Sequence, residues 1–410
     1  MTEHLGRVLL LASFGAVHSM MATASTLTVL TTFSGANGSY PYASLIFDGA
    51  GNLYGTTQLG GAYGYGAVFK LTKPKAGEAT WTETVLKSFK GKDGAGPCAG
   101  LIFDSAGNLY GTTVTGGLYN DGTVFKLTQS EANKHVWTET AIVSFNGATG
   151  ANPYGGLIAD SSGNVYGTTT HGGPNDYGLA FKLAPPATGQ TTWSETIIAS
   201  FIGTNGGWPY ASMIFDSIGN LYGTTSAGGR LGEGTVFRLA PPAAGQTAWT
   251  MTVLRPFSSV EGEGGEPTGN VIADSQGNLY GTTSDGGHCA SGQPCGGTVF
   301  KLRSSGASIW RKKVLGAYYN PMYSYSGLTF DGAGNLYGVA PNYGTSGWVF
   351  KLSKPAPGTA PWTTTYVFGF DGTNGSNPYG SLIVDAAGNL YGTALTGGAY
   401  GLGTVFMLTP

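Results

Sequence analysis

The sequence predicts an all-β protein: a seven-bladed β-propeller with four-stranded blades, closed by its own N-terminal strand. Three observations predict this fold, namely seven tandem repeats, four short β-prone runs in each repeat, and an unusual composition. Glycine accounts for 71 of the 410 residues, charged residues for 10% and aromatic residues for 12%. Average proteins contain about 7% glycine and about 25% charged residues. Many short strands joined by tight turns require such a mixture.

The repeat is marked by an aspartate that is followed three residues later by Gly-Asn-Leu/Val-Tyr-Gly. Successive copies of this aspartate are 56, 56, 56, 58, 57 and 54 residues apart, a drift too small for chance, so the chain is a tandem array of one repeat. The carboxylate accepts backbone N–H bonds and the glycine adopts a positive φ, so we interpret the motif as a structural turn. A calcium loop would need more oxygen ligands. The turn residues are Asp48, Asp104, Asp160, Asp216, Asp274, Asp331 and Asp385.

Each repeat contains four candidate strands whose polarity rises along the chain. The first is Leu45 to Asp48, the second Asn52 to Thr57, the third is represented by Thr123 to Leu127, and the fourth by Trp81 to Phe89. A propeller blade shows the same gradient between the central channel and the outer edge. We therefore expect the first strand to be buried beside the channel and the fourth to be solvated.

The two ends of the chain predict how the ring closes. The last repeat stops after its third strand, 404–408, whereas segment 26–33 resembles a fourth strand. Strand 26–33 should therefore complete the last blade and remove two open sheet edges. This alignment places Ser25 where the other repeats have a tryptophan, at Trp81, Trp137, Trp193, Trp249, Trp310 and Trp362.

Residues 1–24 are typical of a signal peptide. Arg7 precedes the apolar stretch 8–17, and Ala22-Thr23-Ala24 fits a cleavage site. The apolar stretch is shorter than the about 20 residues that span a bilayer. We expect removal of 1–24, a single propeller domain over 25–410 without a membrane span, and a monomer that is secreted, periplasmic or on the cell surface.

Charge and cysteine content exclude several functions. The net charge is −2, and no lysine and arginine cluster is present that would bind nucleic acid; we interpret Arg311-Lys312-Lys313 as a solvated strand face. Cys289 and Cys295 could form a local disulfide in an oxidising compartment, and Cys98 is expected to be a buried free thiol. No catalytic triad order, phosphate loop or zinc spacing is visible, so we expect no cofactor and no metal.

The phrases Asp-x-x-Gly-Asn-Leu-Tyr-Gly-Thr-Thr and Gly-Thr-Val-Phe-Lys-Leu resemble the GloVer tandem-repeat family of exported bacterial proteins. The resemblance covers nearly all of the chain after residue 24. It implies a bacterial origin and export through a signal peptide, and it brings no catalytic residues. Members of the family often carry a C-terminal surface-sorting segment, whereas this sequence ends its last repeat at Pro410.

Ligands usually bind a propeller on the face that carries the loops between strands two and three and the loops between blades. A tyrosine precedes the first strand in five repeats, and these residues should surround the mouth of the channel. They either pack between neighbouring blades or contact a ligand. They are Tyr42, Tyr154, Tyr210, Tyr325 and Tyr379.

Repeats five and six depart from the consensus, so a unique site should lie there. Acids beside flat aromatic rings suit a sugar, because C–H faces stack on rings while hydroxyls bond to carboxylates. Binding of a glycan or another polar ligand competes with a protein partner and with simple drift of unselected loops. The candidate ligand-binding residues are Glu261, Glu263, Glu266, Asp285, His288, Tyr318, Tyr319, Tyr323, Tyr325, Tyr343 and Trp348.

The function we infer is an exported, non-catalytic binding propeller, without assigned catalytic residues. An enzyme is the alternative. Two acids of the blade-five loops could act as the general acid and base of a glycosidase, or His288 with Glu266 as those of a polysaccharide lyase. Binding assays and a polysaccharide-degradation assay separate the two classes.

Overall fold

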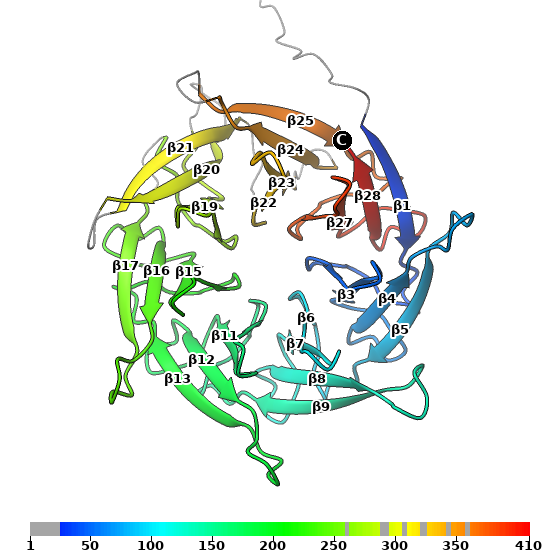
Figure 1. Cartoon of the computed structure of the whole chain (residues 1–410), viewed down its shortest axis with the longest axis horizontal. Helices are drawn as coiled ribbons and strands as arrows, with labels where there is room; N and C mark the ends of the chain where they lie inside the picture. Colours follow the sequence, from blue (N-terminus) through cyan, green and yellow to red (C-terminus); the bar gives the residue numbers. More distant parts are fainter. Residues whose placement is uncertain are drawn as a thin grey trace, which may run out of the picture.

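The computed structural model describes residues 25–258, 262–287, 295–305, 310–319, 326–341, 346–356 and 361–410. Their regular structure is entirely β, in seven four-stranded antiparallel sheets arranged as a ring (Figure 1). This architecture confirms the predicted seven-bladed propeller. The predicted signal peptide, 1–24, lies outside the described residues.

Each blade contributes four strands in the order of the chain, from the channel to the rim, and blade seven borrows its fourth strand from the N-terminus. The first strands are β2 (Ile46–Phe47), β6 (Ile102–Phe103), β10 (Ile158–Ala159), β14 (Ile214–Phe215), β18 (Ile272–Ala273), β22 (Thr329–Phe330) and β26 (Ile383–Val384). The second strands are β3 (Leu53–Thr57), β7 (Leu109–Thr113), β11 (Val165–Thr169), β15 (Leu221–Thr225), β19 (Leu279–Thr282), β23 (Leu336–Ala340) and β27 (Leu390–Ala394).

The third strands are β4 (Ala67–Thr72), β8 (Thr123–Gln129), β12 (Leu179–Ala184), β16 (Thr235–Ala240), β20 (Cys295–Ser304), β24 (Trp348–Ser353) and β28 (Thr404–Thr409). The fourth strands are β5 (Thr82–Ser88), β9 (Trp137–Ser144), β13 (Ser194–Ser200), β17 (Thr250–Pro256), β21 (Trp310–Tyr319), β25 (Thr363–Gly369) and β1 (Thr26–Thr32).

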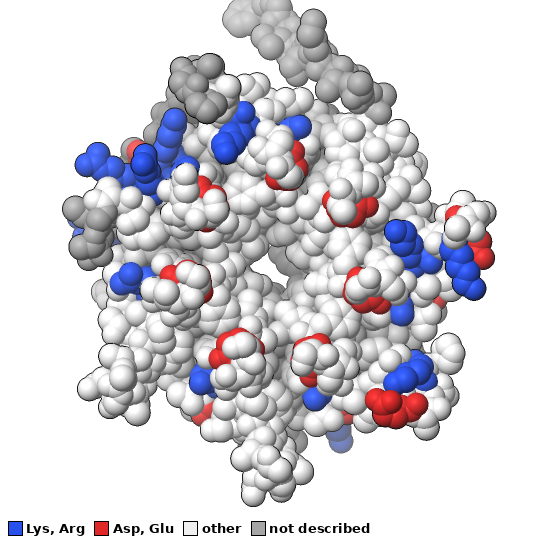
Figure 2. Space-filling view, viewed as in Figure 1, with Lys and Arg blue, Asp and Glu red and all other residues white. Residues whose placement is uncertain are grey.

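Burial does not follow the predicted gradient. The second strands are buried along their whole length, whereas the first strands are two residues long and only partly buried. The expectation that the first strand is the most buried is therefore wrong. The reason is geometric: the first strand is the edge strand nearest the opening at the centre of the ring (Figure 2), while the second strand lies between the first and third strands of its sheet.

Neighbouring blades are joined by pairs of phenylalanines. The phenylalanine that follows a fourth strand packs against one on the third strand of the next blade, with ring centroids 5.1–5.3 Å apart in six pairs. Phe89 and Phe125 are an example, and both are fully buried. These rings lie at the centre of apolar clusters that each span two adjacent blades. The hydrophobic core therefore consists of separate apolar clusters, one between each pair of adjacent blades, and each such contact between blades is here called a joint.

A ring of side-chain hydrogen bonds surrounds the channel inside these joints. A threonine on the second strand of one blade donates its hydroxyl to a backbone carbonyl just before the first strand of the next blade. Six such bonds, 2.7–3.4 Å long, connect Thr56 to Ala99, Thr112 to Gly155, Thr168 to Ala211, Thr224 to Gly269, Thr282 to Ser326 and Thr393 to Ala43.

The N-terminal strand closes the ring as predicted. β1 pairs with β28 from Thr26 opposite Thr409 to Thr32 opposite Thr404, with a register shift between Val29 and Thr31. The other six fourth strands show a similar shift against their third strands. β1 therefore occupies the position of an ordinary fourth strand.

Charged side chains are distributed around the ring rather than concentrated on one side. Figure 2 shows acidic groups spaced at regular intervals around the central opening, with basic groups farther out. In the run Arg311-Lys312-Lys313, the first and last side chains are exposed as expected. Lys312 is the exception, because its side chain is only 4% exposed and its ammonium lies 2.7 Å from the Glu263 carboxylate.

Candidate functional site

The two faces of the ring differ in what they expose. One, here called the turn face, carries the turns between first and second strands. The other, the loop face, carries the loops between second and third strands and the loops between blades. On the loop face these two kinds of loop are joined by backbone bridges, such as Ser39 with Leu59 and Ala151 with His171.

The aspartates of the turn face accept hydrogen bonds from residues of their own turns. The Asp48 carboxylate accepts the N–H groups of Ala50 and Asn52, both at 2.9 Å, the Asn52 amide at 2.7 Å and the Tyr54 hydroxyl at 3.1 Å. Partial burial favours a higher pKa for Asp48, but these hydrogen bonds outweigh burial and hold the pKa below its usual value. The other turns repeat the backbone and asparagine bonds.

A tryptophan from the next blade covers the tyrosine of most turns. Tyr110 and Trp193, for example, meet edge to face at 6.0 Å. Ser25 stands in place of this tryptophan in blade seven, and the tyrosine that faces it is Tyr337. The described contacts of Tyr337 include the Lys351 ammonium 5.3 Å from its ring centre, but no hydrogen bond to Asp331. The joint between blades six and seven is therefore built differently.

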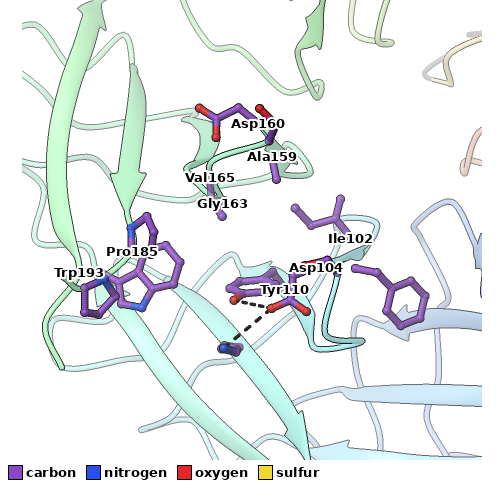
Figure 3. A pocket seen from close by; sticks show the side chains of 14 residues that line it. Ile102, Asp104, Tyr110, Ala159, Asp160, Gly163, Val165, Pro185 and Trp193 are labelled. Atoms are coloured by element: carbon purple, nitrogen blue, oxygen red, sulfur yellow. Dashed lines mark hydrogen bonds and ion pairs between the residues drawn. The ribbon is translucent and has the colours of Figure 1, made fainter. Parts of the chain in front are cut away.

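A groove of about 690 Å³ lies on the turn face between blades two and three. In Figure 3, Trp193 and Pro185 lie on one side of it, and Tyr110 with Asp104 on the other. A similar groove of about 310 Å³ uses equivalent positions between blades five and six. Since the Asp104 carboxylate already has donors from Ala106, Asn108 and Tyr110, its polar wall offers little to a ligand.

On the loop face, one position per blade has an unusual backbone. These residues, here called the collar, lie in the loop that leads into the first strand of each blade. Each stands two positions before the residue that corresponds to Tyr42, at the mouth of the channel. All six described members have φ between +52° and +63°, a region that costs a residue other than glycine roughly 1–2 kcal/mol. They are Tyr40, Gly96, Asn152, Trp208, Glu266 and Asn377.

Each collar residue connects two blades through its backbone. The N–H of Trp208 donates to the carbonyl of Tyr177 in the preceding blade, and its carbonyl accepts the N–H of Ser226 in its own blade. Glu266 makes the same two bonds with Glu233 and Ser284. The backbone is thereby fixed, while the side chain is left free to vary.

The residues that follow the collar form the mouth of the channel. Tyr42, Tyr154, Tyr210 and Thr268 line a cavity of about 170 Å³. Burial raises the pKa of the Tyr154 and Tyr210 hydroxyls. The Thr268 hydroxyl is buried and has no partner among the described residues.

A second cavity in the channel is lined by the mouth tyrosines together with small side chains such as Ala99, Ser212 and Ser381. Tyr379 stacks on Tyr42 at 5.0 Å, so four of the five predicted tyrosines surround the mouth; Tyr325 lies outside the described residues. Farther in, the Ser381 hydroxyl lies 3.2 Å from the Asn270 amide oxygen, a contact that joins blades seven and five.

Trp208 forms an aromatic platform beside this mouth. Its ring lies 6.1 Å from that of Tyr177 and 6.4 Å from that of His171, at interplanar angles of 34° and 38°. Trp208 is 39% exposed and Tyr210, two residues later, is 37% exposed. Sequence reasoning missed Trp208 and Tyr177, although a tryptophan before Pro-Tyr is unique to this repeat.

Three acids lie at the neighbouring joint between blades four and five. Burial, together with the negative charges of Glu266 and Asp285, raises the pKa of Glu233. Glu266 also accepts a hydrogen bond from the Ser284 hydroxyl at 3.2 Å. Glu233 was missed from the sequence, because it belongs to the repeat before the one that carries the other two acids.

The remaining predicted site residues are not brought together. Glu263 pairs with Arg255 at 3.3 Å and with Lys312, away from Glu266. Trp348 packs against Tyr366 at 5.5 Å on the neighbouring strand. Tyr318 and Tyr319 end β21, and nothing is described of their side chains. Outside the described residues lie Glu261, His288, Tyr323, Tyr325 and Tyr343.

Cysteine and metal chemistry add no site. Cys98 takes the place of a channel tyrosine in blade two; it is buried and free, and burial raises the pKa of its thiol to about 12. Cys289 lies outside the described residues, so the predicted disulfide with Cys295 is not described. In the described ranges, no three histidine, cysteine or acidic side chains gather as metal ligands.

No described helix is long and apolar enough to cross a membrane.

Together the fold and the loop face define a repeat-built, closed propeller with an aromatic cavity at one end of its channel. The family model of the Gloeobacter/Verrucomicrobia repeat matches residues 10–138 and 133–308, more than half of the chain. The chain therefore belongs to this family, the GloVer repeat that its sequence motifs resemble.

Two further comparisons add nothing to the family assignment. No curated protein matches the chain. A crystal structure described as a putative oxidoreductase (glucose dehydrogenase) from Thermus thermophilus is similar at 16% identity and a TM-score of 0.44, covering 75% of this chain and 95% of the other. A likeness of this degree carries no argument about activity.

Proposed function

We propose that this chain is an exported, non-catalytic propeller that binds a glycan at the channel mouth of its loop face. The observation that carries the proposal is the cavity at the channel mouth, which is lined by Tyr42, Tyr154, Tyr210 and Thr268. Aromatic walls accept the C–H faces of a sugar, and a few placed polar groups orient its hydroxyls.

The proposal moves the site from blades five and six toward the channel. Glu266 and Asp285 stay near it on the loop face: Glu266 stands two residues before Thr268, and Asp285 is bridged to the neighbouring Gly265. Export is part of the proposal and depends on the signal-peptide pattern of 1–24, which the described residues do not include. A monomer presenting one such mouth is sufficient for binding.

The test is a glycan array followed by calorimetry on the chain 25–410. Removing the Tyr210 ring (Tyr210→Ala) should weaken binding of an array-selected glycan by about tenfold or more, as for a central aromatic contact. Tyr119, 59% exposed on a loop of blade two outside the cavity, is the matched control. Tyr119→Ala should leave the affinity within about twofold, as for a residue outside the contact surface.

Unchanged affinity in both Tyr210→Ala and Tyr154→Ala would show that the glycan binds elsewhere. A chain that binds proteins but none of the arrayed glycans would favour the protein-partner alternative and refute the proposal.

A carbohydrate-active enzyme is the second candidate, and the raised pKa of Glu233 beside two other acids favours it. A carboxyl group that keeps its proton serves as a general acid, while an ionised neighbour serves as base or nucleophile. Release of reducing ends or unsaturated products from polysaccharides, abolished by Glu233→Gln, would replace the non-catalytic proposal with this one.

A further inference from the structure

The collar retains large side chains where glycine would be favoured. A positive φ strains every residue except glycine, and the chain is rich in glycine, yet only Gly96 among the six described members is one. Residues held in sparsely populated conformations cluster at functional sites. Trp208 is the bulkiest of these side chains, and it is exposed although its neighbours hold its backbone in place.

The size of the channel-mouth cavity limits what enters it. Its volume of about 170 Å³ lies below the about 300–1,000 Å³ of typical ligand pockets. A single sugar ring is the unit that suits it, so the rest of an oligosaccharide would lie outside. Trp208 stands two residues before the cavity-lining Tyr210 and exposes its ring on the same loop face, against Tyr177 and His171.

The acids beside the mouth disfavour an oligosaccharide that carries negative charge. Glu233, Glu266 and Asp285 form an acidic cluster, in which burial and then the negative charges of the other two acids raise the pKa of Glu233. A chain of uronic acids would add further negative charge there. Neutral sugars whose hydroxyls are equatorial avoid this repulsion and present flat C–H faces to an aromatic ring.

We propose that Trp208 is the stacking platform of a second subsite, which selects neutral, equatorially substituted oligosaccharides whose terminal unit occupies the tyrosine cavity. This inference rests on the proposed function and deepens it. In this proposal the tyrosine cavity binds the first sugar unit. Trp208 stacks on the units that follow, and its contact accounts for the higher affinity of longer oligosaccharides.

The experiment measures binding of glucose, cellobiose and cellotetraose to the chain 25–410 and to Trp208→Gly. The parent should bind cellotetraose about tenfold or more tightly than glucose, and Trp208→Gly should lose most of this gain while binding glucose as before. Trp208→Phe should retain most of it, since it keeps an aromatic ring. An oligogalacturonate of equal length should bind the parent more weakly than cellotetraose.

Folding is controlled by the same substitution, because glycine is the residue best suited to the backbone of position 208. Relief of the backbone strain offsets the lost ring contacts with Tyr177 and His171, so the unfolding temperature of Trp208→Gly should stay close to that of the parent. Asn377→Gly is the matched control: it makes the same backbone change at a collar position outside the proposed subsite, and it should not alter binding.

The outcomes separate this inference from the proposed function. Equal loss of glucose and cellotetraose binding in Trp208→Gly, or no loss at all, would overturn the second subsite. The same holds if array-selected glycans bind at Tyr210 but no member of the cello-oligosaccharide series binds. If no glycan binds the parent chain, the proposed function is wrong, and the second subsite, which rests on it, is wrong with it.

Discussion

Three glutamates at one repeat position have different partners. Glu83 accepts hydrogen bonds from Thr31 and Asn37 at 2.7 and 2.8 Å. Glu139 pairs with the Lys87 ammonium at 3.2 Å. For Glu195 the residue equivalent to that lysine is Val143, and no hydrogen bond reaches its carboxylate within the described ranges. Burial raises the pKa of Glu195 to about 7.

This difference predicts a stability that depends on pH. Glu195 ionises more readily in the unfolded chain, so its contribution to folding is complete below its unfolded pKa, near 4.5, and is lost as pH rises through about 7. Glu195→Gln should thus unfold at a higher temperature than the parent at pH 8. Allowing for solvent screening of this partly exposed group, the gain is roughly 1–2 kcal/mol.

Thermal unfolding of both chains between pH 4 and 8 measures the effect, which should shrink toward pH 4. Glu139→Gln is the comparison: burial raises the pKa of Glu139 as well, but the Lys87 ammonium opposes this rise, so Glu139→Gln should gain less stability at pH 8 than Glu195→Gln. Parallel pH profiles for the parent and Glu195→Gln would contradict the assignment.

At the scale of elements, the ring of threonine hydrogen bonds is open at one joint. Blade six has Val339 where the other blades have threonine, so its side chain has no hydroxyl to donate to the Gly380 carbonyl of blade seven. Val339 is fully buried. Blade seven also lacks the tryptophan that would cover Tyr337, so two contacts of the repeat are missing from the joint next to the chain ends.

Restoring the hydroxyl should strengthen this joint. Val339→Thr keeps the shape of the side chain and supplies the missing donor, and a hydrogen bond of this kind contributes about 0.5–1.5 kcal/mol net. Denaturant unfolding should show a higher midpoint with an unchanged slope. The reverse change, Thr56→Val, removes the bond to Ala99 and should lower the midpoint by a similar amount. A lower midpoint for Val339→Thr would mean that its hydroxyl is buried without a partner.

At the scale of the whole molecule, most of the fold follows from the sequence because the repeat is long and regular. The number of blades follows from the seven copies of the repeat, and the closing strand follows from the likeness of segment 26–33 to a fourth strand. The short first strand was not predictable, because an apolar run such as Leu45 to Asp48 looks alike whether it is buried or lines a channel.

The candidate site was only partly predictable, for a related reason. Glu266 and Asp285 stand out in the sequence because they break their own repeat. Glu233 and Trp208 depend on contacts across a joint between blades, and a comparison within one repeat does not show such contacts. The positive φ at Trp208 is likewise imposed by backbone bonds to two different blades.

The last prediction concerns closure of the ring. If the joint made by β1 is as strong as the others, Phe33 should contribute as much to stability as its equivalent Phe89. Both rings are fully buried, and they pack at 5.2 Å on Phe69 and at 5.1 Å on Phe125, respectively. Each change to alanine should cost about 3–5 kcal/mol in the free energy of unfolding. A much smaller cost for Phe33→Ala, measured by denaturant unfolding, would show that the N-terminal strand detaches before the ring unfolds. If the two substitutions lower the free energy of unfolding equally, the joint made by β1 is as strong as a joint between blades that are continuous in the chain. The N-terminal strand would then unfold together with the rest of the ring.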